Sequence, residues 1–246
     1  MDLLIAGAKD LGISLNADHL RDFRKYAEAL VAWNQRFNLT AITDDVGIQI
    51  RHLLDSLSCL LALESQGRLN QARVIDVGTG AGFPGLPLKI LRPHIHLTLL
   101  ESTAKKVRFL EHVVDLLSLE NVTMLHGRAE ELGRWVDYRE SYDWALARAV
   151  AEMSVLAEYL VPLVKVGGHV LAQKGENAPA EVQRAEFAVT TLGGRVRRLV
   201  PVEMRGLAET RYLVVLDKVA ATPAKYPRRP GMPSKRPLQD PNGTDI

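Results

Sequence analysis

From Arg73 onward the sequence alternates short β-rich runs with apolar segments of helical period, and this alternation restricts the fold more than any other feature. The β-rich runs are Val74–Val77, Leu97–Glu101, Val122–His126, Trp144–Ala147 and His169–Gln173. Helical segments such as Lys105–Leu117 and Met153–Val164 lie between them. Strands that alternate with helices form a parallel sheet with helices on both faces. We therefore predict an α/β fold with a doubly wound, mostly parallel sheet.

The segments on either side of this core have a different pattern. Two runs, Val196–Val202 and Arg211–Leu216, are predicted to be antiparallel edge strands joined by a loop around residues 204–209. Before the core, residues 18–36 form an amphipathic pattern for which Asp18 is a suitable N-cap, and residues 46–64 form a second helical pattern. The predicted organisation is a helical cap over 1–66, a core over 67–219 and a tail over 220–246.

The strongest chemical signal is the run Val74-Ile-Asp-Val-Gly-Thr-Gly-Ala-Gly-Phe-Pro-Gly85, an apolar strand followed by a glycine-rich turn. A helix is predicted to start at about Leu86. Ligands of open α/β sheets bind beyond the carboxyl ends of the strands, and glycines let the backbone approach them closely. Glu101 ends the next strand, 25 residues after Asp76, close to where an acid that holds ribose hydroxyls belongs.

The composition of the turn distinguishes two classes of cofactor. A dinucleotide site requires Gly-x-Gly-x-x-Gly, but Phe83 takes the third glycine position here. The Asp76 carboxylate would repel a pyrophosphate and would suit the methionine ammonium of S-adenosylmethionine. The sequence thus favours S-adenosyl-L-methionine, held by Asp76, Gly78, Gly80, Gly82 and Glu101, over a ligand-free tight turn.

Three further strand ends carry candidate residues. Ala129 and Glu130 are expected beside the adenine of the cofactor, although Glu130 also suits the first turn of a helix as an acid. Arg148 ends the fourth strand over the middle of the sheet, and Lys174 follows the fifth. An arginine whose only role is to be solvated at the surface could lie at many other positions. We therefore predict that Arg148, at a strand end where ligands bind, is functional.

The charge is unevenly distributed along the chain. Between Arg195 and Arg236 there are eleven lysines and arginines and three acids, although the whole chain carries only +2. Six of the twelve prolines fall in the last 24 residues, which predicts an extended tail. A basic, extended segment suits a polyanion, but it is equally typical of a solvated tail.

Composition also restricts the setting of the protein. One cysteine, Cys59, excludes an internal disulfide and a cysteine-cluster metal site, and it favours a reducing cytoplasm. We see no apolar run of about 20 residues and no signal peptide, so no membrane is expected. No histidine partner lies at ligand spacing from His52, so no metal is predicted.

Taken together, these motifs resemble the RsmG (GidB) family over roughly residues 20–218. The matching motifs are Asp76–Pro87 with its Gly-Phe-Pro-Gly extension, Glu101–Lys106, Arg128–Glu130, Ala147–Ala149, Lys174–Gly175, Asn38–Thr40, Arg51–Ser56 and the run that begins at Tyr226. The resemblance implies a class I (Rossmann-like) methyltransferase that modifies N7 of one guanine, guanine 527, in 16S ribosomal RNA. It further implies cofactor contacts from Gly78, Phe83, Ala129, Glu130 and Arg148. Ala147 stands where the family often has serine, so a hydroxyl contact is not expected there.

The chemistry agrees with that implication. Guanine N7 carries a free lone pair and no proton, so methyl transfer requires alignment rather than a general base. Arg148 is the predicted catalytic residue, because its planar fork can hold the cofactor carboxylate or orient the base. Residues expected to contact RNA are Asn38, Thr40, Arg51, His52, Lys174, Arg197 and Arg205, with Arg198, Arg211 and the tail cations as further candidates. Asn38–Thr40 is equally typical of a helix-capping loop.

Two other functions remain compatible with the sequence. A methyltransferase that acts on a protein or a small molecule would share the glycine turn, but the basic C-terminal third argues against it. A non-catalytic nucleotide- or RNA-binding module would bind the cofactor without turnover, and the combination of Asp76, Glu101 and Arg148 argues against that. The expected partner is 16S ribosomal RNA or the small ribosomal subunit, bound by a monomer.

Overall fold

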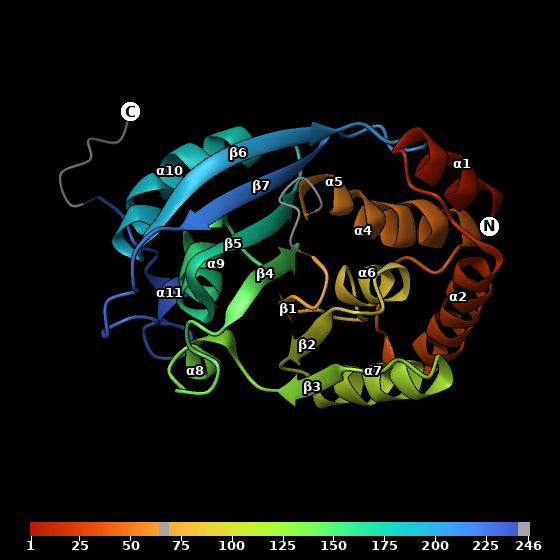
Figure 1. The fold of residues 1–246 in the computed structure, drawn as a ribbon, viewed down its shortest axis with the longest axis horizontal. Coiled ribbons are helices and arrows are strands. Elements are labelled where there is room, and N and C mark those ends of the chain that lie inside the picture. Colours follow the sequence, from red (N-terminus) through yellow and green to blue (C-terminus); the bar gives the residue numbers. More distant parts are fainter. Residues whose placement is uncertain (64–68, 241–246) are drawn as a thin grey trace.

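A computed structural model of the chain describes residues 1–63 and 69–240. Seven strands form one sheet in the order β3-β2-β1-β4-β5-β7-β6 (Figure 1). Their bounds are β1 Arg73–Val77, β2 His96–Glu101, β3 Val122–His126, β4 Tyr142–Arg148, β5 Val164–Lys174, β6 Gly194–Val202 and β7 Arg211–Lys218. The first five strands are parallel, and β7 pairs antiparallel with both β5 and β6. The doubly wound sheet with antiparallel edge strands is therefore confirmed.

Helices cover both faces of this sheet (Figure 1). One face carries α6 (Gly85–Leu91), α7 (Ala104–Leu116) and the N-terminal helices, and the other carries α8 (Ala129–Leu132), α9 (Met153–Leu160) with a 3₁₀ turn η3 (Val161–Leu163), α10 (Ala178–Thr191) and α11 (Met232–Lys235). Each face buries its own cluster of apolar side chains. The carboxyl ends of β1, β2, β3, β4 and β5 consequently meet at one open edge, where ligands of such sheets bind.

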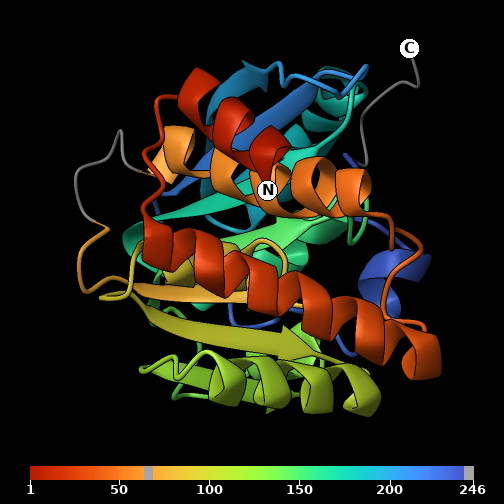
Figure 2. The same ribbon diagram turned by 90° about the vertical axis from the view of Figure 1, so that its right-hand side faces the viewer.

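The N-terminal region is more helical than predicted. An additional helix, α1 (Asp2–Asp10), precedes α2 (Ala17–Phe37), and α2 crosses the front of the molecule in Figure 2. Asn16, rather than Asp18, caps α2, because its side-chain oxygen accepts from His19 N–H at 2.8 Å. Asp18 instead forms an exposed ion pair with Arg21.

The predicted helix over 46–64 is present but is not a regular α-helix. It consists of α3 (Asp45–Gly47), a π-helical stretch η1 (Ile48–Leu54), α4 (Asp55–Ser58) and α5 (Leu60–Leu63). A π-helical turn rotates the side chains that follow it, and such turns are frequent at functional sites. The last predicted residue of this helix and the predicted boundary between 66 and 67 lie outside the described residues.

The same segment, residues 45–63, is long and apolar enough to cross a membrane by length and composition alone. However, 83% of its most apolar window is buried inside the protein. Its leucines belong to the core cluster between the N-terminal helices and the sheet. The apolar character of this segment is explained by packing.

The C-terminal segment differs from the extended tail that its prolines predict. Residues 220–240 pack on the core, where Arg139 donates to the carbonyl oxygens of Thr222 and Tyr226 at 2.6 and 2.7 Å. Arg228 forms a two-pronged ion pair with the buried Glu158. These contacts join residues more than 65 positions apart, and for this reason local composition did not reveal them. Residues 241–246 lie outside the described part.

Candidate active site

A glycine loop connects β1 to α6 and forms the first wall of the site. Gly78, Gly80 and Gly82 have φ angles of +67°, +63° and +100°, which only glycine adopts without strain. A Cβ at Gly80 would meet only a carbonyl oxygen 4.0 Å away, so this part of the loop presents open backbone. The conformation explains the predicted need for glycine at all three positions.

Asp76 lies beneath this loop and is fully buried. Its Oδ2 atom accepts hydrogen bonds from Gly85 N–H at 2.8 Å and from the Thr79 hydroxyl at 2.6 Å. Its Oδ1 atom accepts none from residues 1–63 and 69–240. Burial raises the pKa of Asp76 from 3.8 to about 6, although those two donors and Arg148 lower it in part. Oδ2 therefore braces the loop, while Oδ1 is buried with an unused acceptor position.

Glu101 connects the loop to the end of β2. Its carboxylate accepts from Gly80 N–H at 3.0 Å and from Thr103 N–H at 2.8 Å. The side chain is 5% exposed and thus fixed in place. Each carboxylate oxygen retains a further lone pair, so a ribose hydroxyl can still donate to it.

A cavity of about 160 Å³, here called the glycine-loop cavity, opens beside the loop. Its lining residues are Val77, Gly78, Leu100, Ser102, Gly127, Arg128, Ala129, Glu130, Val150 and Tyr159. Ala129 and Glu130 thus lie on the wall of this cavity, and their contact with an adenine stays a prediction. Glu130 also anchors the C-terminal segment, because its Oε1 accepts from Gly231 N–H at 2.9 Å.

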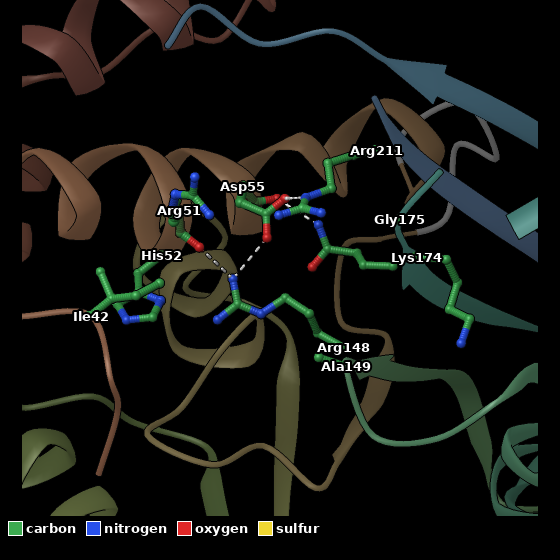
Figure 3. A pocket seen from close by; sticks show the side chains of 10 residues that line it. Ile42, Arg51, His52, Asp55, Arg148, Ala149, Lys174, Gly175 and Arg211 are labelled. Atoms are coloured by element: carbon green, nitrogen blue, oxygen red, sulfur yellow. Dashed lines mark hydrogen bonds and ion pairs between the residues drawn. The ribbon is translucent and has the colours of Figure 1, made fainter. Parts of the chain in front are cut away.

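A second cavity of about 310 Å³, here called the arginine pocket, lies next to it (Figure 3). Its lining residues are Ile42, Arg51, His52, Asp55, Arg148, Ala149, Gln173, Lys174, Gly175 and Arg211. Ala149 lines this pocket and its neighbour Val150 lines the first, so the two cavities adjoin at the loop after β4. Ala149 has a φ of +54°, a strained conformation for alanine that is typical of functional loops.

Arg148 is the central side chain of the arginine pocket. Its Nη1 donates to Asp55 Oδ2 at 2.9 Å and to the carbonyl oxygen of Arg51 at 3.0 Å (Figure 3). The guanidinium lies over the Phe83 ring, 5.0 Å from its centroid. The remaining donors of its planar fork are thereby held in a fixed orientation.

Phe83 lies behind the arginine pocket in an aromatic stack. Its ring stacks on His52 at 4.5 Å between centroids and on Tyr26 at 5.3 Å. Burial, and then the nearby Arg148, lower the pKa of His52 to about 4. With this pKa His52 is neutral near pH 7, so any contact that it makes with RNA, which stays a prediction, would be through hydrogen bonding or stacking and not through charge.

The loop at residues 38–40 supports this stack. The Thr40 hydroxyl is 3.0 Å from His52 Nε2, and Asn34 Oδ1 accepts from Thr40 N–H at 2.9 Å. Asn38 ends α2 in the left-handed conformation with a φ of +49°. The helix-capping interpretation of this loop therefore describes its structure, while Thr40 also reaches the pocket through His52.

The remaining predicted cations are differently placed. Lys174 lines the arginine pocket, but its Nζ pairs with Glu181 at 2.5 Å and donates to the carbonyl oxygen of Ala151. Arg197 pairs with Asp217 toward the other end of the sheet, and Arg205 pairs with Asp10 in an exposed loop. Arg198 donates to the carbonyl oxygen of Ala62. The distribution of charge along the sequence does not show which arginines lie at the end of the sheet that carries the pocket and which lie at the opposite end.

Asp55 and Gln173 line the arginine pocket without having been predicted as site residues. Strand pairing sets Arg148 beside Gln173, and the N-terminal helix carries Asp55 across the ends of both strands. Asp55 lies in a helix and Gln173 in a strand, and no motif in the sequence links the two residues. They are recognised as site residues only because the helix crosses the strand end in the folded protein.

Replacing Gly82 with alanine is expected to lower the melting temperature strongly, whereas Gly80→Ala should lower it only slightly. A Cβ at Gly82 would lie 2.5 Å from the Tyr26 hydroxyl oxygen and 2.5 Å from Leu86 Cδ1, and it would strain the backbone. At Gly80 only the positive φ is penalised, by about 1 kcal/mol. Thermal unfolding of both variants checks this prediction, and equal melting temperatures would contradict it.

Solved structures with similar folds are class I methyltransferases. An S-adenosylmethionine-dependent methyltransferase from Aquifex aeolicus superposes with a TM-score of 0.52 at 18% identity, covering 70% of this chain and 93% of the other. TrmN from Thermus thermophilus gives a TM-score of 0.52 at 20% identity, covering 67% of this chain and 49% of that one. These likenesses define the class I methyltransferase fold.

Sequence comparison defines the family. The model of the GidB family, described as rRNA small subunit methyltransferase G, matches residues 19–208, and the chain belongs to this family. The ribosomal RNA small subunit methyltransferase G of Roseiflexus castenholzii is 50% identical over 238 residues, which are 97% of this chain and all of the relative. That of Alkaliphilus metalliredigens is 45% identical over 96% of this chain and 98% of its own.

Proposed function

We propose that this chain transfers a methyl group from S-adenosyl-L-methionine to N7 of a guanine in 16S ribosomal RNA, at the position of guanine 527. The observation that carries the proposal is that two cavities adjoin at the loop that follows Arg148, one beside a glycine loop and one lined by arginines. Membership of the GidB family supports this assignment of substrate.

The residues of the glycine loop and of the strand ends around it fit S-adenosylmethionine. The buried, unpartnered Asp76 Oδ1 suits a cationic amino group, Glu101 suits ribose hydroxyls, and the open backbone at Gly78 and Gly80 suits close approach. When bound, this cofactor supplies the methyl group on a positively charged sulfur. Ala129 is proposed to contact the adenine, and Glu130 to support that wall through Gly231.

The arginine pocket is proposed to hold the target base. Guanine N7 needs no proton removed, so the pocket must orient the base and exclude water. Arg148 orients the base with its fixed fork, while the Phe83–His52 stack supplies an apolar wall. Neutral His52 adds no positive charge beside a base that becomes cationic on methylation.

RNA outside the pocket is proposed to follow the rim around it. Arg51 has an exposed side chain at this rim, and Asn38 is exposed nearby. Arg197 and Arg205 are then outlying phosphate contacts, carrying position but no sequence information. The proposal includes a monomeric enzyme that acts in the cytoplasm on 16S ribosomal RNA or the small subunit.

The affinity for S-adenosylmethionine is expected to rise about tenfold between pH 5 and pH 7, with a midpoint near pH 6. The cationic amino group requires ionised Asp76, and burial holds the pKa of that carboxyl at about 6. Because this pKa is raised above 3.8, Asp76 lowers the stability of the cofactor-free protein as pH rises from about 4 to 6, and its effect is constant above that. Titration calorimetry at several pH values measures the change in affinity.

Asp76→Asn is the matched variant for this prediction. It should bind the cofactor at least about tenfold more weakly at pH 7 and lose the dependence on pH. An affinity of the native protein that does not change across this range would refute the assignment of Asp76 to the amino group.

The substrate class is tested by incubation with labelled S-adenosylmethionine and small ribosomal subunits from cells that lack the enzyme. Label in 16S ribosomal RNA supports the proposal. Label in ribosomal protein or in the small-molecule fraction would instead establish the alternative, a methyltransferase of the same fold with another substrate.

A further inference from the structure

Three buried polar atoms of the arginine pocket have no hydrogen-bond partner among the described residues: His52 Nδ1, Asp55 Oδ1 and Gln173 Oε1. The last two are oxygens that can only accept. Asp55 Oδ1 and Gln173 Oε1 accept no hydrogen bond from the residues that the structure describes, and their side chains are 4% and 3% exposed. A buried acceptor that lacks a donor destabilises the folded protein, because it has lost its hydrogen bonds to water. Native proteins rarely keep such atoms without a functional reason. Two of them in one pocket indicate a ligand with two donors.

The surrounding contacts fix both atoms in place. Asp55 Oδ2 accepts from Arg148, and Oδ1 forms an ion pair with Arg211 Nε at 3.6 Å, which is too long for a hydrogen bond (Figure 3). Gln173 Nε2 donates to the main-chain oxygen of Asp55 at 2.6 Å and to Ser58 Oγ at 3.3 Å. These two bonds define which end of the amide is nitrogen, so the Gln173 oxygen must be the unpartnered end.

The chemistry of the bases shows which ligand such a pair would take. The Watson–Crick edge of guanine presents two adjacent donors, N1–H and the 2-amino group, followed by the acceptor O6. Adenine and uracil each place an acceptor at one of the two donor positions, and cytosine places acceptors at both. Two acceptors beside an arginine therefore complement guanine alone, and holding this edge leaves N7 on the opposite side uncovered.

We propose that Asp55 and Gln173 select guanine in the arginine pocket, with Asp55 Oδ1 accepting from N1–H and Gln173 Oε1 from the 2-amino group. Arg148 then donates to O6. This inference rests on the proposed function, since it assigns recognition of the same target base. Asp55 has a second effect as a positioning residue, because it holds the Arg148 guanidinium.

Inosine tests this assignment, because it is guanosine without the 2-amino group. The target guanosine is mapped first and then replaced with inosine in 16S ribosomal RNA by ligation of RNA fragments. The native enzyme is expected to methylate the inosine RNA with a kcat/KM about 10- to 100-fold lower than the guanosine RNA. Equal rates would overturn the inference while leaving the proposed function intact. No methylation of either RNA would count against the proposed function itself.

Gln173→Met tests the residue assignment. It removes the acceptor at similar volume and is expected to reduce the preference for guanosine over inosine to less than about threefold. A purely structural role would lower both rates equally and preserve the ratio, which would overturn the assignment. Gln183→Met, on the exposed face of α10, is the matched control and should keep the native ratio. Because the native enzyme alone can refute the proposal, the test does not depend on the variant folding.

Discussion

Replacing Arg148 with alanine is expected to lower kcat/KM for methyl transfer by about 100-fold or more. The guanidinium is held by Asp55 and by the carbonyl oxygen of Arg51, and it lies over Phe83 beside the loop at which the two cavities adjoin. Misplacement of a reacting base by about 1 Å costs on this order. The loss should fall mainly on kcat, since Arg148 orients the base rather than supplying most of the RNA affinity.

Two further variants make the test specific. Arg148→Lys keeps the charge but loses the planar fork. Its kcat/KM should therefore exceed that of Arg148→Ala by less than about tenfold. Arg184→Ala removes an exposed arginine from α10 and should leave the rate unchanged. Thermal unfolding must accompany the assay, because Arg148→Ala leaves Asp55 buried beside a pocket. A folded Arg148→Ala protein with a native rate would contradict the proposed role.

Replacing Arg228 with alanine is expected to lower the free energy of unfolding by about 3 kcal/mol. Glu158 is completely buried, and Arg228 donates to both of its oxygens, at 2.7 Å from Nη2 and 3.0 Å from Nε. Removing one partner of a buried ion pair leaves an uncompensated charge. The neighbouring arginine provides the control, because Arg229 is exposed and Arg229→Ala should change stability by less than about 0.5 kcal/mol.

Urea unfolding of the two variants measures this difference. Equal stabilities would mean that the C-terminal segment does not hold to the core through Arg228. The result also bears on the cofactor site, because the same segment reaches Glu130 through Gly231. Loss of the ion pair should therefore weaken S-adenosylmethionine binding as well as stability.

The parallel core could be predicted from sequence because local signals agreed there. Each predicted strand from Val74 to Gln173 lies within an observed strand, since short, mostly apolar runs are separated by segments of helical period and by the glycine turn. Helix α10 was not predicted, because alanines such as Ala178, Ala185 and Ala188 form most of its buried face and give a weak apolar period. Helix α1 was also missed.

The site could be predicted only where its residues carry a motif. Gly78, Gly80 and Gly82 were predicted from the turn, and Arg148 from its strand end. The role of Asp55 depends on a helix crossing strands more than 90 residues away, which no local pattern encodes. The course of the C-terminal segment depends in the same way on Glu158 and Arg139, so its prolines alone predicted a free tail.

The measurement that tests the central claim most directly is nucleoside analysis of 16S ribosomal RNA after incubation with the enzyme and labelled S-adenosylmethionine. We predict that the label is found in 7-methylguanosine, at a single position, and that Arg148→Ala greatly reduces it. Label in any other nucleoside would contradict the account of the arginine pocket as a site for guanine N7. Label in protein or in small molecules, with none in RNA, would contradict it as well.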